Sequence, residues 1–213
     1  MSKEEPNPTG TRARLLAAAE RLFADRGYDG TSVRDVTEAA GANVAAVNYH
    51  FGGKERLYLE VFGARTAEMT ALREQALACA TGEAGPSGNV AAVLRAFVGS
   101  CLHNLMSPGG SDCFPRLVFR EMASPGPAFE YLVENIAEPN HRVLRGLILG
   151  AAPGLSEEQA LLCVASVFGQ MLHFVRARRM IERLGGRSYD AEFVDQICEH
   201  VVRFSLGGIE GVS

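Results

Sequence analysis

The sequence predicts an all-α protein of about nine helices, with three short helices at the N-terminal end, a long connecting helix and a larger helical region after it. Three observations support this fold class. Apolar residues recur at helical spacing along the whole chain, no segment shows the alternation of a half-buried strand, and capping residues stand where the helices should begin and end. With 213 residues, 47% of them hydrophobic and 22% charged, the chain can bury a sizeable core.

Capping residues set most of the expected helix boundaries. Ser32 with Asp35, and Ser156 with Gln159, have the spacing of capping boxes that start helices. Pro127 is expected at the first position of a helix, and Pro139 should break or kink the helix that contains it. The expected helices span about 11–26, 32–40, 44–51, 54–80, 89–106, 114–122, 127–149 with an interruption at Pro139, 156–184 and 190–206.

The chain divides into three parts on this pattern. Residues 1–10 are polar, contain two prolines and should form a short disordered arm. Residues 11–58 form a small N-terminal domain, and residues 59–213 form a larger C-terminal one. Within the latter, Thr81–Gly88 (TGEAGPSG) has the composition of a linker, and Ser107–Asp112 is expected to be a loop.

Composition and motifs exclude several function classes. A net charge of −4 argues against a protein that binds polyanions non-specifically, so a nucleic-acid site must be local. The five cysteines are scattered and form no CxxC pair, which predicts reduced thiols. With no signal peptide and no run of about 18 apolar residues, we expect a cytoplasmic protein. The motifs GxSxG and HExxH are absent, as is a glycine-rich phosphate loop, so we expect no enzymatic activity, cofactor or metal.

The second and third expected helices have the proportions of a helix-turn-helix, with Gly41 in the turn. In such a unit the second helix enters the DNA major groove by its N-terminal end. Val47 and Phe51, four residues apart, suit its core-facing side, while Asn43 can cap it. Helix-glycine-helix segments are common in helical proteins, so these proportions alone leave DNA binding open.

A longer stretch is more specific. Residues 18–36 (AAERLFADRGYDGTSVRDV), 39–43 (AAGAN) and 48–58 (NYHFGGKERLY) resemble the N-terminal domain of TetR-family repressors without a gap between residues 18 and 58. Gly52-Gly53, together with Phe119-Arg120-Glu121, are similar to the CecR-like branch of that family. The resemblance implies a DNA-binding transcriptional regulator that works as a homodimer.

The resemblance also implies which side chains bind DNA. Residues at the start of the second helix and just beyond the third would contact phosphates, and residues at the leading edge of the third would face the bases. The phosphate-binding residues would be Thr31, Arg34, Tyr49, His50 and Lys54, and the base-facing residues would be Asn43, Val44, Ala45, Ala46 and Asn48.

The chain departs from the family pattern at two of these positions. Val44 stands where the family often has a cation, and Asn48 stands where it often has an aromatic residue. Val44 could contact a thymine methyl group, while Asn48 could bond a base edge or a phosphate. From Thr9 to Tyr58 there are seven basic and six acidic residues, a balance of +1. A single domain should therefore bind DNA weakly, and affinity should depend on placement and dimerisation.

The C-terminal domain is expected to pair subunits and to bind a ligand. The last two expected helices carry apolar stripes wider than one buried face needs, and the family resemblance implies an isologous four-helix bundle there. Apolar residues interrupted by polar ones predict a pocket for a small apolar or amphipathic molecule. The candidate ligand-binding residues are Phe97, Cys101, Leu105, Phe114, Leu117, Arg120, Glu121, Gln170, His173 and Phe174.

The sequence therefore predicts a regulator, most simply a repressor, that a small molecule releases from a palindromic operator. Two alternatives stay open: a TetR-like dimer without a small-molecule inducer, and a helical interaction module without DNA affinity. Whether His103, Arg120, Glu121 and His173 line a pocket or support the fold is also open at this point.

Overall fold

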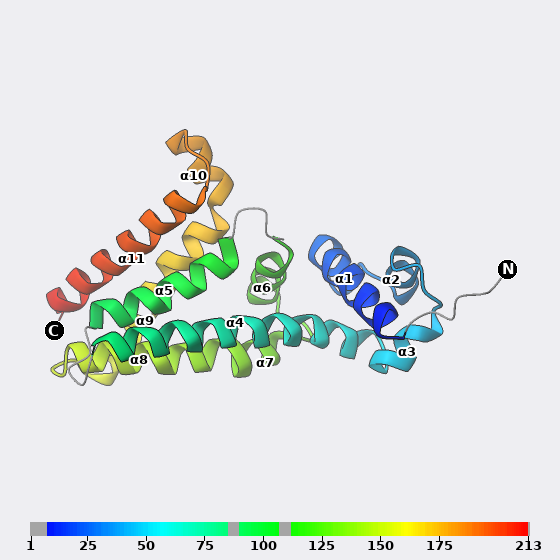
Figure 1. The fold of residues 1–213 in the computed structure, drawn as a ribbon, viewed down its shortest axis with the longest axis horizontal. Coiled ribbons are helices and arrows are strands. Elements are labelled where there is room, and N and C mark those ends of the chain that lie inside the picture. Colours follow the sequence, from blue (N-terminus) through cyan, green and yellow to red (C-terminus); the bar gives the residue numbers. More distant parts are fainter. Residues whose placement is uncertain (1–7, 85–89, 107–111, 213) are drawn as a thin grey trace. The chain divides into compact units, whose positions relative to one another are not determined.

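The computed structural model describes residues 8–84, 90–106 and 112–212, and all the regular structure in these ranges is helical (Figure 1). This confirms the predicted all-α class. The elements are α1 (Pro8–Arg26), α2 (Val33–Ala39), α3 (Ala45–Phe51), α4 (Lys54–Ala84), α5 (Val90–Met106), α6 (Cys113–Ala123), α7 (Phe129–Leu132), the π-helical segment η1 (Val133–Ala137), α8 (Glu138–Ala151), α9 (Glu157–Arg176), α10 (Arg178–Gly185) and α11 (Ala191–Val212).

The helices form two compact units. The N-terminal unit comprises Met1–Thr66 and Cys113–Asn135, and the C-terminal unit comprises Ala67–Asp112 and Ile136–Ser213. The boundary predicted from the sequence lies between residues 58 and 59. In the structure this boundary lies between Thr66 and Ala67, farther along α4. Helices α6 and α7 also belong to the N-terminal unit, although they lie far along the chain.

Two expected irregular segments are partly helical. Helix α1 begins at Pro8, so the last three residues of the expected arm are helical, and residues 1–7 lie outside the described ranges. Helix α4 continues to Ala84, through the first half of the expected linker. The Thr81 hydroxyl donates to the carbonyls of Leu77 and Ala78, four and three residues earlier in the same helix. Residues 85–88 of the linker and 107–111 of the expected loop are not described.

One of the two proline expectations needs correction. Pro127 lies in a turn, and α7 begins only at Phe129. The expected interruption at Pro139 is present: the α-helical pattern gives way to the π-helical segment η1, and Pro139 occupies the first turn of the next α-helix, α8. Proline lacks an N–H donor and its ring crowds the carbonyl four residues earlier. The change to wider π geometry just before Pro139 allows the chain to continue as a helix.

The C-terminal helices also differ from expectation in their ends. The helix that starts at the Ser156 capping box ends at Arg176, and α10 follows after Ala177. The last helix extends to Val212, beyond the expected end near Leu206. Ile209 is 5% exposed and packs in the core, which anchors these additional turns. The Ser156–Gln159 capping box itself is confirmed, with both of its hydrogen bonds present.

Each unit has its own core. In the N-terminal unit, the aromatic rings of Phe23, Tyr58 and Phe62 are fully buried and contact one another edge to face. In the C-terminal unit, α5 lies beside α11, α9 packs against both, and α8 packs against α5 and α9, around an apolar core (Figure 1). Helix α9 is the one described helix that is long and apolar enough to cross a membrane by length and composition. One face of α9 is buried in this core through Ala160, Val164 and Val167.

Candidate nucleic-acid interface

The first helix of the predicted helix-turn-helix is fixed at its N-terminus. The Ser32 hydroxyl accepts a hydrogen bond from the Asp35 N–H at 3.1 Å, and the Asp35 carboxylate accepts one from the Ser32 N–H at 2.8 Å. These bonds to Ser32 hold the pKa of Asp35 below its usual value. The predicted capping box of α2 is thereby confirmed, and it fixes the point at which the chain enters the helix.

The turn between α2 and α3 depends on Gly41. This residue has a φ of 59°, a left-handed conformation that residues with a side chain rarely adopt. The N–H groups of Gly41 and Ala42 bond the carbonyls of Glu38 and Thr37 at 3.1 and 2.9 Å, which satisfies the end of α2. The Arg14 guanidinium on α1 donates to the Ala40 carbonyl at 3.1 Å. The turn is therefore held both by its own backbone and by α1.

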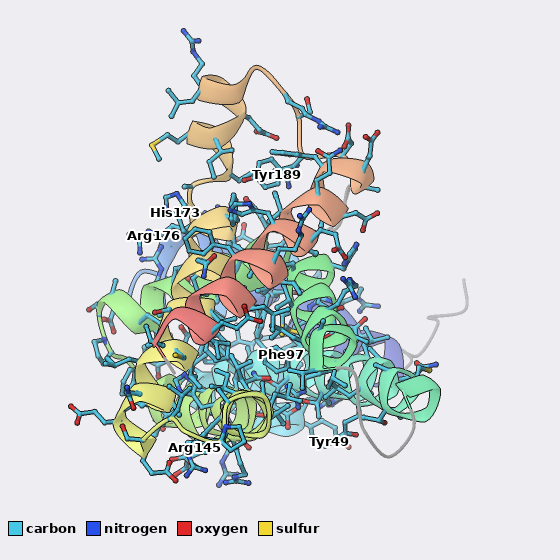
Figure 2. All side chains as sticks on the ribbon, turned by 90° about the vertical axis from the view of Figure 1, so that its left-hand side faces the viewer. Tyr49, Phe97, Arg145, His173, Arg176 and Tyr189 are labelled. Carbon is cyan, nitrogen blue, oxygen red and sulfur yellow. The ribbon has the colours of Figure 1, made fainter. Side chains whose placement is uncertain are left out.

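Helix α3 has one buried side and one exposed side. Val47 and Phe51 are 0% and 5% exposed and pack into the N-terminal unit, as predicted. The opposite side presents Val44 and Tyr49, 51% and 83% exposed, and Tyr49 is labelled in Figure 2. Three more predicted contact residues are exposed, Asn43, Ala45 and Asn48, while Ala46 and His50 are partly exposed. The N-cap of α3 is Val44, one residue after the expected Asn43, but the Asn43 side chain still accepts from the Ala45 N–H at 2.9 Å at the start of this helix.

The chain leaves α3 through two glycines that adopt positive φ angles, Gly52 at 77° and Gly53 at 134°. They bring Lys54 to the first position of α4, with its ammonium 4.1 Å from the centre of the Tyr28 ring. This cation–π contact holds the ammonium over the Tyr28 ring. Arg34 on α2 is exposed. One basic residue thus precedes α3 in the sequence, Arg34, and one follows it, Lys54. Positive charge at these positions suits phosphate binding.

Thr31 is placed differently from the expectation. Its side chain is 1% exposed, and its hydroxyl donates to the carbonyls of Gly27 at 2.9 Å and Leu22 at 3.1 Å. These bonds tie the end of α1 to the start of α2. The structure therefore gives Thr31 a role inside the N-terminal unit, and the phosphate contact predicted for it falls on a side chain that is not at the surface.

Four of the predicted ligand-binding residues belong to the N-terminal unit. Phe114 and Leu117 are buried apolar residues of α6. Glu121 is 2% exposed, and its two carboxylate oxygens accept from the Tyr58 hydroxyl at 2.7 Å and the Gly126 N–H at 2.9 Å. Burial together with this bond raises the pKa of Tyr58 far above its usual value. Glu121 thus joins α6, α4 and the following turn.

Arg120 has a similar structural environment. Its guanidinium lies so close to Gly27 that a Cβ atom there would meet Nη1 at 2.9 Å, and it donates to the carbonyls of Ala24 and Asp25 at 3.4 Å. The resemblance-based motif Phe119-Arg120-Glu121 therefore holds α6 against the end of α1. A ligand role for Arg120 and Glu121 stays a prediction.

The other six predicted ligand-binding residues belong to the C-terminal unit. Phe97 is fully buried and lies among the interior side chains (Figure 2), and three partly buried residues, Cys101, Leu105 and Phe174, pack against the same core. Gln170 and His173 lie instead on a grooved surface formed by α9 and α11. His103, left open by the sequence, contacts Asp195 of α11 through Nε2 at 2.9 Å.

Sequence reasoning missed two polar residues of this unit, Arg73 on α4 and Asn140 on α8. The Arg73 Nη1 donates to the Asn140 Oδ1 at 2.5 Å. One signal in the sequence could have indicated that Arg73 faces the core. It lies one helical turn before Leu77, which packs against the core, and this spacing puts both residues on one side of α4.

An apolar surface remains on α9 and α11. Leu161, Leu162 and Phe204 are 54%, 62% and 64% exposed, although the opposite side of each helix is packed in the core. Both helices contribute to an apolar groove here, lined among others by Leu162, Cys163, Ser166, Phe204, Gly208 and Ile209. The wide apolar stripes predicted from the sequence are thus present.

Comparisons with known proteins agree with this arrangement. Residues 15–61 match the family model of bacterial regulatory proteins of the tetR family, and residues 90–209 match that of the C-terminal domain of the HTH-type transcriptional dual regulator CecR. CecR of Shigella flexneri is 26% identical over 205 residues, covering 89% of this chain and 87% of that protein. The repressor AcnR of Corynebacterium glutamicum is 42% identical over 62 residues, covering 29% of this chain and 33% of its own.

Solved structures show the same fold. A candidate transcriptional regulator from Pseudomonas aeruginosa superposes with a TM-score of 0.71 at 22% identity, covering 97% of this chain and 96% of the other. The TetR-family regulator PfmR from Thermus thermophilus has a TM-score of 0.68 at 20% identity, covering 92% and 95%.

The helix-turn-helix of the N-terminal unit, followed by a helical C-terminal unit, defines a transcriptional regulator of the TetR family. Within that family the chain belongs to the CecR-like branch, since the CecR C-terminal model matches more than half of its length.

Proposed function

We propose that this regulator is a homodimeric, cytoplasmic repressor that binds a palindromic operator through α3 and is released from it by a small molecule. The observation that carries the proposal is the leading edge of α3. Val44, Ala45 and Asn48 are exposed there on a backbone held by the Asn43 side chain, the Gly41 turn and the buried Val47. Small and polar side chains on a rigid helix can approach base edges closely.

Each predicted contact residue except the buried Thr31 then has a defined part. Asn43, Val44 and Ala45 enter the major groove first, because they are at the N-terminal end of α3, with Ala46 and Asn48 one turn further along. Arg34, Tyr49 and Lys54 donate to phosphates, together with the partly exposed His50, and fix the register.

The apolar surface of α9 and α11 is the proposed dimer interface. A face that exposes Leu161, Leu162 and Phe204 is unfavourable in water and is covered if the same face of a second subunit packs against it. The pair then presents two α3 helices to half-sites roughly one DNA turn apart, about 34–36 Å. Two reading helices also compensate for the small positive charge of one unit.

DNA binding is tested with duplex from the region upstream of the chain's own gene. Tyr49→Ala should weaken binding by about tenfold, because it removes one phosphate donor and its contact area. Arg34→Ala should also lower the slope of log affinity against log salt by about 1. Arg142→Ala is the matched control, since Arg142 is an exposed arginine on α8. Full affinity in Tyr49→Ala would remove its assigned role, and salt-independent binding would contradict the groove contact as a whole.

Dimerisation is tested by sedimentation velocity. Leu162→Glu places a charge in the proposed interface and should give a monomer that also loses DNA affinity. Leu72→Glu changes another exposed leucine, 44% exposed on α4, and should leave the dimer intact. A Leu162→Glu protein that stays dimeric would place the interface elsewhere.

The ligand response rests on the reciprocity of binding at two sites. A molecule that binds the C-terminal unit best in a conformer unsuited to DNA must be bound more weakly when DNA is present. Helix α4 belongs to both units, running from Lys54 beside α3 to Ala84, so it is the element through which we expect this coupling to pass.

A further inference from the structure

The Arg73 side chain is incompletely bonded. Its Nη1 donates to the Asn140 Oδ1 at 2.5 Å, but its Nε is buried and makes no hydrogen bond. Within the described residues no carboxylate forms an ion pair with it. A buried donor without a partner costs free energy, and the cost is larger when the donor is charged. The Arg73 Nε therefore lacks an acceptor, which an anion could supply.

The surroundings of Arg73 are apolar. Burial of the Cys101 thiol on α5 raises its pKa to about 11, while the nearby charge of Arg73 acts in the opposite direction. Phe97 and Leu105 lie one helical turn on either side of Cys101, and all three pack in or against the core. Leu77, one turn beyond Arg73 on α4, packs against that core as well. The cation is thus close to apolar side chains of the core.

Asn140 determines which edge of the guanidinium stays available. Its Nδ2 donates to the Ile136 carbonyl, at the π-helical segment η1, at 2.7 Å, so its amide is oriented with Oδ1 toward Arg73. Nη1 is occupied by this oxygen, which leaves the edge formed by Nε and Nη2. Two parallel N–H groups on one edge are the arrangement that binds a carboxylate in bidentate fashion.

We propose that Arg73 anchors the carboxylate of an amphiphilic ligand, whose apolar part packs along the row of Phe97, Cys101 and Leu105 on α5. This inference rests on the proposed function, since it names the chemical class of the molecule to which the regulator responds. It also explains why Arg73 has no internal counter-ion: the ligand supplies it. The anchor lies on α4, the same helix that begins at Lys54 next to the recognition helix.

The direct test is calorimetric titration of the full-length protein, without DNA, with decanoate and with naphthoate, using decanol as the uncharged counterpart of decanoate. Wild type should bind at least one of the two acids. If it binds decanoate, it should bind decanol at least about tenfold more weakly. Arg73→Met should lower the affinity for the acid by at least about tenfold and leave the affinity for decanol unchanged. Failure of both acids to bind, or acid binding that survives Arg73→Met, would overturn the proposal.

A second variant guards against misfolding of the first. Asn140→Asp supplies a carboxylate from the chain itself at hydrogen-bonding distance from Arg73. It should abolish acid binding, because the guanidinium is then neutralised internally, even though the new carboxylate cannot replace the bond of Nδ2 to the Ile136 carbonyl. Asn140→Ala, which adds no charge, is the matched control and should keep acid binding. Acid binding retained by Asn140→Asp would contradict the anchor.

The same samples separate this inference from the proposed function. Binding of an acid through Arg73 without release of operator DNA would support the anchor and contradict ligand-controlled release. Release of DNA by decanol, undiminished in Arg73→Met, would support ligand control and overturn the carboxylate anchor.

Discussion

Glu121 in the N-terminal unit and Arg73 in the C-terminal unit are both charged side chains with buried polar atoms, but they differ in how completely they are bonded. Each carboxylate oxygen of Glu121 accepts a hydrogen bond from within the unit. The Arg73 guanidinium has one bond to Asn140 and a buried Nε without a partner. The buried charge of Glu121 is fully bonded and supports the fold, whereas the half-bonded Arg73 is where we propose that a ligand completes the hydrogen bonding.

The largest expected effect tests the first half of this comparison. Glu121→Leu should lower the free energy of unfolding by about 3 kcal/mol, because the buried Tyr58 hydroxyl and the Gly126 N–H both lose their acceptor. Glu121→Gln should cost only about 1 kcal/mol, since the amide oxygen can accept from Gly126 while the phenol oxygen accepts from the amide nitrogen. Urea denaturation followed by circular dichroism measures both. Equal losses for Leu and Gln would show that packing, and not hydrogen bonding, dominates at this position.

A smaller effect is expected when one donor is removed. Tyr58→Phe keeps the buried ring but leaves one oxygen of Glu121 unpaired, and it should cost about 1–2 kcal/mol. Tyr131→Phe in the same unit is the control, because the Tyr131 hydroxyl makes no hydrogen bond within the described residues. A Tyr58→Phe protein as stable as wild type would mean that Glu121 finds another donor, which would weaken the contrast with Arg73.

The same contrast explains how far the sequence could predict this molecule. The capping boxes at Ser32 and Ser156 and the Gly41 turn are local signals, so the helix-turn-helix and the start of α9 were predicted correctly. The bond between Tyr58 and Glu121 joins residues 63 positions apart, and no local pattern indicates it. The orphan nitrogen of Arg73 is a property of the packed unit and cannot be read from spacing.

The errors in helix ends have a tertiary origin as well. Proline removes an α-helical hydrogen bond, so the interruption at Pro139 was predictable, but its form, the π-helical segment η1, was not. The predicted ligand residues were grouped by their distribution of apolar and polar types, which does not reveal that α6 packs in the N-terminal unit and α5 in the C-terminal one. Local chemistry determines the helix-turn-helix of this regulator, whereas long-range packing decides in which unit each predicted ligand residue lies.

The smallest effect compares the two capping boxes, one in each unit. Ser32→Ala and Ser156→Ala should each cost about 1 kcal/mol at neutral pH. The boxes differ at their third residue, which is the ionisable Asp35 in α2 and the neutral Gln159 in α9. Because the folded-state pKa of Asp35 is lowered, its contribution is present above its unfolded pKa and is lost as pH falls through the folded value. When unfolding is measured from pH 7 down to about pH 3, the stability loss caused by Ser32→Ala should therefore become smaller, and that caused by Ser156→Ala should stay unchanged.

Exchanging the chemistry of the two boxes, with Asp35→Asn and Gln159→Glu, should move the pH dependence from α2 to α9. If the stability loss caused by Ser32→Ala and that caused by Ser156→Ala depend on pH in the same way, the Asp35 carboxylate does not support α2.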